Sequence, residues 1–244
     1  MALDSPLLAR RRVVAAALET TTGTPVALTA AAAAMNVFNA KFKAEIPANQ
    51  RPGAVSFSPL PPIAGAQKGT LTFETELVGN GAIGIPFWAN TLLPGICFPV
   101  PGTGQQFSPL TGSQTTLTLG LYLDGRLFTI SGAQGAAKIT AEVGKPVMIE
   151  WTFDGVWQPP TSTAILAPTL PTVLPPRFAG AAMTIGATVY RVGKVEIDIK
   201  NTITLREDQS QTSGYHSAFA TSREITIKCM SNHWPPSAFT REVT

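Results

Sequence analysis

The stretch Thr115–Gly132, TTLTLGLYLDGRLFTISG, decides the fold class of this 244-residue chain. Leucine occupies every second position from Leu117 to Leu123, and a period of two is typical of a β-strand with one apolar face. Asp124-Gly125 follows, the dipeptide that favours a type I′ hairpin turn. The chain then returns through a second apolar run. The stretch therefore predicts an antiparallel β-hairpin.

The same alternation recurs in four other stretches, at 70–77, 146–157, 194–206 and 224–228. Each has one apolar and one polar face, as strands of antiparallel sheets do when one side meets water. We expect roughly eight to eleven short strands in an all-β fold, an antiparallel sandwich or partly closed barrel. The predicted core consists of Leu71, Phe73, Leu119, Leu121, Ile149, Trp151, Phe153, Val195, Ile197 and Ile227.

One short helix is predicted over Pro86–Leu93, where apolar residues recur near helical spacing before Pro94. Ala27–Met35 has helical propensity but no amphipathic stripe. Two Pro-rich segments, 36–69 and 158–180, are predicted to be long loops, and loops of such length are usually functional or disordered.

A single domain over 1–228 is expected, with an N-terminal arm at 1–25 and a C-terminal extension at 229–244. The first long loop and the N-terminal arm are predicted to be extended arms that contact a neighbouring subunit. Apolar side chains on a Pro-rich loop cannot all reach their own core and would form an exposed patch. The candidate contact residues are Arg10, Arg11, Arg12, Phe38, Phe42, Ile46 and Phe57.

Composition and residue types argue against an enzyme. Charged residues make up only 14% of the chain and the net charge is +3, too small for a strong phosphate-binding field. His216 and His233 are the only histidines, and Cys97 and Cys229 the only cysteines. Two distant thiols are neither a disulfide framework nor a zinc pattern. We therefore expect no catalytic site, no metal and no cofactor, and neither a secretion signal nor a membrane span.

Several motifs, in order along the chain, resemble those of the tail tube proteins of long-tailed bacteriophages. A basic start and an apolar run lead into ETTTGTP (Glu19–Pro25), although Thr22 stands where that family commonly has Tyr. The other matching segments are LTFETELVGNG (71–81), LLPGICF (92–98), LYLDGRLFTISGAQG (121–135), VMIEWTFDGVWQPPTSTAIL (147–166) and EIDIKNTITLRED (196–208). The chain departs from the family in its end, KCMSNHWPPSAFTREVT.

The resemblance implies a structural virion protein without catalytic or ligand-binding residues. It implies hexameric rings of the protein itself, stacked into a hollow tail tube through which DNA passes without specific binding. Terminator, tape-measure and distal tail proteins are the other implied partners, with assembly in the host cytoplasm and no membrane contact.

Two alternatives stay open at this point. A neck, tail-terminator or head decoration protein would form a single ring or cap. A β-sandwich module that binds carbohydrate or a receptor would need an aromatic platform, for which Trp157, Trp234 and Phe239 are the candidates.

The bore of such a tube is predicted to be neutral or weakly acidic, because a basic wall would retain phosphates. Glu74 and Glu76 share the polar face of one strand and are the candidates for lining it. Glu196 and Asp198, which are flanked by lysines, are predicted to form ion pairs between subunits instead.

Overall fold

The computed structural model describes residues 11–53, 57–81, 84–100, 106–185 and 188–230. The strands, in order, are β1 (Arg12–Leu18), β2 (Val37–Glu45), β3 (Ala48–Arg51), β4 (Leu60–Ala64), β5 (Lys68–Glu76), β6 (Leu117–Leu123), β7 (Arg126–Glu142), β8 (Met148–Ser162), β9 (Met183–Ile185), β10 (Thr188–Tyr190), β11 (Lys194–Glu207) and β12 (Tyr215–Met230). The helical segments are η1 (Ala31–Ala33), η2 (Trp88–Leu92) and η3 (Pro94–Ile96). The predicted all-β class is confirmed, and the described strands form no closed barrel.

One antiparallel sheet holds eight strands in the order β1-β6-β7-β8-β5-β2, and β11 joins it through β7 and carries β12. The first part of β7 pairs with β6, and its last part, from Ala137, pairs with β11. The register between β7 and β8 shifts between Ser131 and Gln134, where Gly132 has a φ of +56°. Glycine adopts that conformation more readily than residues with a Cβ atom, and such a bulge bends a strand.

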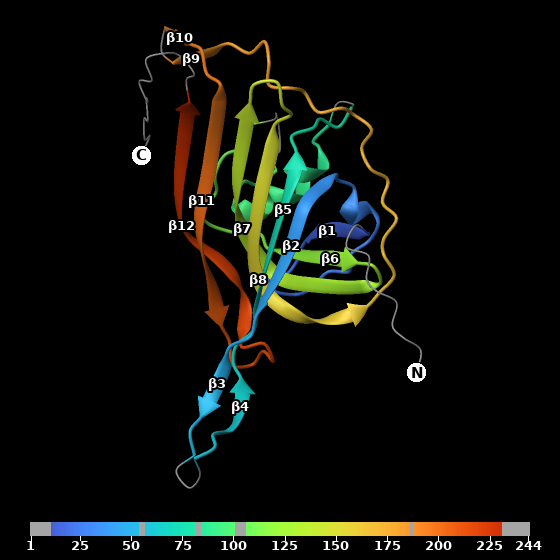
Figure 1. The fold of residues 1–244 in the computed structure, drawn as a ribbon, viewed down its shortest axis with the longest axis vertical. Coiled ribbons are helices and arrows are strands. Elements are labelled where there is room, and N and C mark those ends of the chain that lie inside the picture. The colour runs from blue at the N-terminus through green and yellow to red at the C-terminus, as the bar shows by residue number, and fades with distance from the viewer. Residues whose placement is uncertain (1–10, 54–56, 82–83, 101–105, 186–187, 231–244) are drawn as a thin grey trace.

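The bend folds the sheet into two layers. In Figure 1, β1 and β6 lie crosswise to the upright strands, on the side of β2 and β5 and away from β11 and β12. Val14 of β1 and Leu119 of β6 join one buried cluster with Phe73 and Trp151 of the upright layer. The core therefore lies between the two layers, as it does in a β-sandwich.

The strand alternation predicted most of this core. Leu71, Phe73, Leu119, Leu121, Ile149, Trp151 and Phe153 are all buried. The rings of Trp151 and Phe153 lie 6.1 Å apart at 11°, and the Trp151 indole donates a hydrogen bond of 2.9 Å to Oγ1 of Thr75. The predicted type I′ turn is also present, since Asp124 and Gly125 both have positive φ.

Three predicted core residues are wrong. Val195 and Ile197 are only half-buried, and Ile227 is 38% exposed. These three side chains lie on one apolar face of the sheet. That face stays partly exposed because β12 is an edge strand and the second layer does not cover this end of the sheet. On the opposite face Glu196 is only 9% exposed.

The predicted short helix is confirmed within one or two residues. Helix η2 spans Trp88–Leu92 and η3 follows directly, and the side chains of Leu92 and Ile96 are fully buried against the sandwich core. Between Ala27 and Met35 only the single turn η1 forms.

The segments predicted to be arms and loops contain more regular structure than expected. Residues 36–69 form β2, β3, β4 and the start of β5, and residues 1–25 include β1, which pairs along its whole length with β6. Strand β8 continues to Ser162, and residues 163–182 then run along one side of the molecule with a single β-bridge, Pro146 to Arg177. Strands β2, β3 and β4 are mostly exposed and show no alternation of apolar residues, which is why the sequence pattern does not mark them, whereas β1 is buried at Val14, Ala15 and Ala16.

Candidate assembly surfaces

The hairpin formed by β3 and β4 projects from one end of the molecule (Figure 1). All nine residues of its two strands are exposed, including Leu60 and Ile63, and Phe57 beyond β3 is fully exposed. Its strands pair only with each other, from Ala48↔Ala64 to Arg51↔Leu60. An exposed apolar patch of this kind marks an interaction surface.

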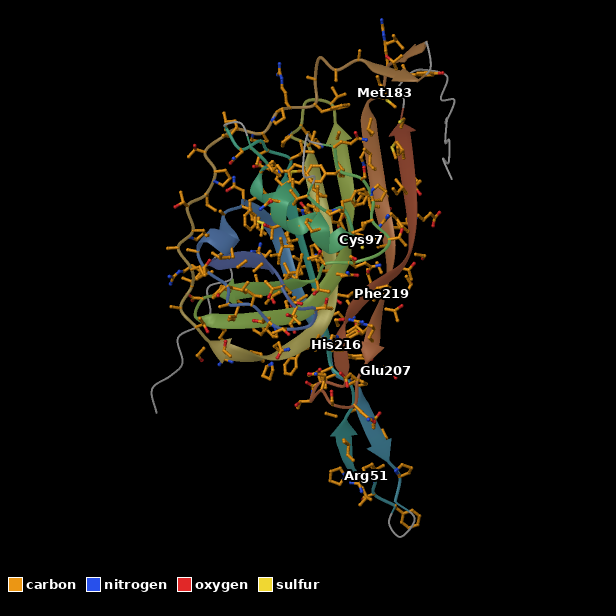
Figure 2. The ribbon with its side chains drawn as sticks, turned by 180° about the vertical axis from the view of Figure 1, so that it is seen from behind. Arg51, Cys97, Met183, Glu207, His216 and Phe219 are labelled. Atoms are coloured by element: carbon orange, nitrogen blue, oxygen red, sulfur yellow. The ribbon has the colours of Figure 1, made fainter. Side chains whose placement is uncertain are left out.

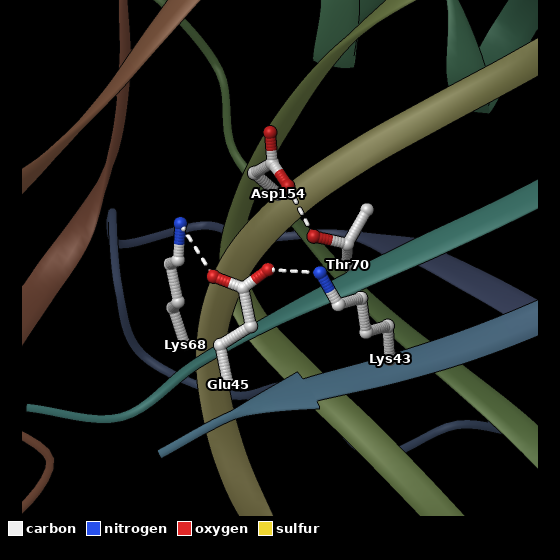
Figure 3. A network of polar contacts seen from close by, with 5 residues as sticks. All are labelled: Lys43, Glu45, Lys68, Thr70 and Asp154. Atoms are coloured by element: carbon white, nitrogen blue, oxygen red, sulfur yellow. Dashed lines mark hydrogen bonds and ion pairs between the residues drawn. The ribbon is translucent and has the colours of Figure 1, made fainter. Parts of the chain in front are cut away.

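An ion-pair cluster fixes the point where this hairpin leaves the body (Figure 3). The Glu45 carboxylate forms ion pairs with the ammonium groups of Lys43 at 2.6 Å and Lys68 at 2.9 Å. The hydrogen bond from Lys43, followed by that from Lys68, lowers the pKa of Glu45 to about 2. The same contact with Glu45 raises the pKa of Lys68. Because Glu45 ends β2 and Lys68 begins β5, the cluster ties together the two strands that support the hairpin.

The four apolar candidates of segment 36–69 do not form one surface. Phe42 is half-buried and packs against its own core, with its ring 5.5 Å from that of Phe128, and its place in an intersubunit contact stays a prediction. Phe38 is exposed at the far end of β2 from the hairpin. Ile46 lies at the base of the hairpin and Phe57 lies beyond β3, and both side chains are exposed.

Two of the three N-terminal arginines have partners within the chain. The Arg11 guanidinium lies 2.9 Å from the carboxylate of Asp124, and Nη1 of Arg12 donates to the Ala40 carbonyl at 3.1 Å. These contacts hold β1 against the β6–β7 turn and against β2. Arg10 lies outside the described residues, and a role of the three in subunit contacts stays a prediction.

The sequence analysis did not single out Glu19 as a structural centre. Its side chain is buried, and its carboxylate accepts hydrogen bonds from the hydroxyls of Thr116 at 2.6 Å and Thr118 at 2.8 Å. The backbone N–H groups of Gly132 and Gly23 donate at 2.7 and 2.9 Å. The sequence signal for this role was an acidic residue directly after the apolar run of β1, at the start of the ETTTGTP motif.

The predicted bore residues lie on the outer polar face of β5. Glu74 is half-buried, accepts a hydrogen bond of 3.1 Å from Nδ2 of Asn39, and lies directly across from Glu150 of β8. Glu150 is exposed, so this part of the face carries two adjacent carboxylates. Glu76, one strand repeat further, lines a cavity at the end of β5.

The second acidic pair has a different environment. Glu196 forms ion pairs with Lys194 at 2.5 Å and Lys138 at 3.2 Å, all within one chain. The hydrogen bond from Lys194 is the main cause of its lowered pKa. The Glu196 charge is thus neutralised inside the subunit. Asp198 lies beside it across from Lys138.

The residues considered for chemistry form no recognisable reaction centre within the described part of the chain. His216 lies near the end of the body from which the hairpin projects (Figure 2). Its ring is 3.2 Å from the Ser217 hydroxyl and 3.3 Å from the Arg206 guanidinium. Cys97 is buried, which raises the pKa of its thiol. Over the same residues, no three His, Cys, Asp or Glu side chains are placed to hold a metal ion.

The four other candidates add little. Trp157 is half-buried, while Trp234, Phe239 and His233 lie outside the described residues. No helix in the described part of the chain is long and apolar enough to cross a membrane.

Comparison with known families confirms the resemblance seen in the sequence. The model of the family described as "Phage tail tube protein" matches residues 9–229. The match includes β1, the Glu19 motif, the hairpin and every strand to β12, and ends where the C-terminal extension was predicted to begin. No curated protein matches the chain.

Proposed function

Because the chain belongs to the phage tail tube protein family and is a structural component of the virion tail, we propose that it forms hexameric rings that stack into the DNA-conducting tail tube. Self-association and contact with other tail proteins follow from membership of the family. The hexameric ring, the passage of DNA, the terminator, tape-measure and distal tail partners and assembly in the host cytoplasm are our proposal.

The observation that carries the proposal is the projecting β3–β4 hairpin. It exposes Phe57, Leu60 and Ile63, and among the described strands β3 and β4 pair only with each other. A contact between such a projection and a different surface on the next copy is head-to-tail, and head-to-tail contacts build open filaments when they do not close. A stack of rings is a filament of this kind.

The two free edges of the upright layer support a lateral contact within each ring. Among the described strands, β2 pairs only with β5, and β12 pairs only with β11. These two strands are the opposite edges of one layer. An unpaired edge strand presents a row of N–H and C=O groups that another chain can use. Repeated edge-to-edge contact around an axis would close a ring.

The outer polar face of that layer is our candidate for the wall of the bore. Glu74 and Glu150 contribute carboxylates there, and Lys138 and Glu196 neutralise each other nearby. A wall without excess positive charge lets the phosphate backbone pass without the counterion release that makes DNA bind.

Electron microscopy of the purified protein tests the proposal. Long tubes support it, single rings favour the terminator or decoration alternative, and monomers favour a binding module.

A variant in which Asn-Gly replaces residues 46–67 tests the role of the hairpin. Glu45 and Lys68 are register partners, so a two-residue turn can join β2 directly to β5. We expect a folded protein that forms no tubes. Tubes of normal length from this variant would remove the hairpin from the assembly.

A further inference from the structure

A cavity of about 370 Å³ lies at the end of β5, opposite the hairpin. Its walls come from the residues before β2, from the end of β5, from η2 and from the extended segment at 169–173. The side chains that matter here are Met35, Glu76, Val78, Trp88, Leu170 and Val173. Trp88 is fixed in the wall because its indole N–H donates to the Val78 carbonyl at 2.9 Å.

We propose that this cavity receives Phe57 from the hairpin of a second copy in the adjacent ring. The inference rests on the proposed stacking of rings and adds the receiving surface. Nothing else in the described hairpin matches the cavity as well: Phe57 is its one aromatic side chain and is fully exposed.

The direction of β5 determines which copy of the protein can supply the phenyl ring of Phe57. Lys68, at the start of β5, adjoins the hairpin, and Glu76, at its end, adjoins the cavity. Nine residues of strand separate the two sites by about 30 Å. The hairpin extends further in the opposite direction, by about 35 Å from Ile46 to Phe57 if fully extended. The hairpin of one copy therefore cannot reach its own cavity, but a copy shifted along the strand direction can.

Size and charge both fit this occupant. An apolar cavity of about 150 Å³ is enough to bind benzene, so the cavity has room for a phenyl ring and part of its neighbours. Arg51 is the one charged residue between Ile46 and Gln67, and Glu76 is the one charged residue among the described residues that line the cavity. Pairing of these two would fix the register of the contact.

The rim of the cavity adds an apolar surface for the rest of the hairpin. Leu170 is 47% exposed and Val173 and Leu174 are exposed beside it. Leu60 and Ile63 of β4 are exposed in turn. The contact would cover apolar side chains on both copies, and their burial is what stabilises most protein interfaces.

Disulfide trapping between two variants tests the contact directly. Both carry Cys229→Ser, and Cys97 stays because its buried thiol is a poor nucleophile. One variant adds Phe57→Cys and the other adds Val173→Cys. After mixing under assembly conditions and mild oxidation, we expect a disulfide-linked dimer on a non-reducing gel. Val143→Cys is the matched control, since Val143 is exposed at the same end of the sheet, in the turn after β7.

The control should give at least tenfold less dimer with Phe57→Cys. Equal yields from Val143→Cys and Val173→Cys, or no dimer with Val173→Cys in preparations that form tubes, would overturn the contact and leave the tube itself in place. Failure of the unmodified protein to assemble would instead contradict the proposed function.

A charge exchange provides the second test. We expect Arg51→Glu and Glu76→Arg each to reduce the sedimenting tube fraction about tenfold, and the double variant to restore most of it, because only the double variant recovers the pair. A circular dichroism spectrum that matches that of the unmodified protein shows that each variant is folded. Single variants that assemble as well as the unmodified protein would show that Arg51 does not meet Glu76.

Discussion

The carboxylate of Glu19 accepts a 2.7 Å hydrogen bond from the backbone N–H of Gly132, 113 residues further along the chain. Glu19 follows β1, and Gly132 lies at the bulge where β7 bends from one layer into the other. The same carboxylate also binds the hydroxyls of Thr116 and Thr118 before and within β6. One buried side chain thus joins the N-terminal strand, its neighbour and the bend of the sheet.

Replacing Glu19 should destabilise the fold strongly. Glu19→Ala leaves the N–H groups of Gly132 and Gly23 without their acceptor, and hydrogen bonds to charged groups contribute about 1.5–3 kcal/mol each. We expect a loss of about 3 kcal/mol or more in the free energy of unfolding, measured by urea denaturation. Glu150→Ala, at an exposed carboxylate, is the control and should change it by less than about 0.5 kcal/mol.

The difference in burial between Trp151 and Ile227 predicts different costs of truncation. Trp151→Ala removes a fully buried ring and should cost about 3–5 kcal/mol. Ile227→Ala, on the uncovered end of the sheet, should cost less than about 1 kcal/mol in the isolated subunit, since much of its side chain already meets water. Both values come from the same denaturation experiment. A large effect at Ile227 in the monomer would mean that its surface is covered there.

The ion pairs of Glu45 predict a specific pH dependence at the base of the hairpin. The folded pKa, about 2, lies below the ordinary value of 4.5 for a glutamate, so the contribution of the cluster to stability is fully present above about 4.5. It is lost as the pH falls from there through about 2. Carboxyl chemical shifts in an NMR titration should give this pKa.

The lysines provide the matched variants for that titration. Lys43→Met with Lys68→Met should return the pKa of Glu45 towards its ordinary value, whereas Lys41→Met, on the same strand, should leave it low. A low pKa in the double variant would mean that another group stabilises the carboxylate.

Charge reversal at the proposed bore wall separates assembly from DNA passage. Glu74→Lys with Glu150→Lys should leave tubes intact and slow DNA delivery by phage that carry the variant, because added positive charge retains phosphates. The neutral pair Glu74→Gln with Glu150→Gln is the control and should deliver DNA at nearly the normal rate. If the reversed variant forms no tubes, this face belongs to a subunit contact.

Alternation of apolar residues predicted the parts of the fold in which both layers are present. It identified Trp151 and Phe153 because every second residue of β8 faces the other layer. It was wrong for Val195 and Ile227 because alternation shows which residues share a face, but not whether anything covers that face. The packing of Phe42 against the core was not predicted for a related reason: a β-strand in a Pro-rich segment carries no clear period.

The candidate surfaces were harder to predict than the core. The exposed apolar residues of the hairpin, Ile46 and Phe57, were recognised from composition. The role of Glu19 depends on donors about one hundred residues away, and the cavity beside Glu76 is built from four separate segments. Neither arrangement leaves a local pattern in the sequence.

The continuity of the hairpin with β2 and β5 has a mechanical consequence. A pull on the hairpin along its length is applied directly to these two strands, and β5 lies between β2 and β8. The hydrogen bonds of an antiparallel sheet are perpendicular to its strands, so such tension loads them in shear and they must yield together. If neighbouring rings hold each other through this hairpin, a bent or stretched tail would load the hydrogen bonds of edge strand β2 and of its neighbour β5 together in shear, instead of peeling β2 away one bond at a time.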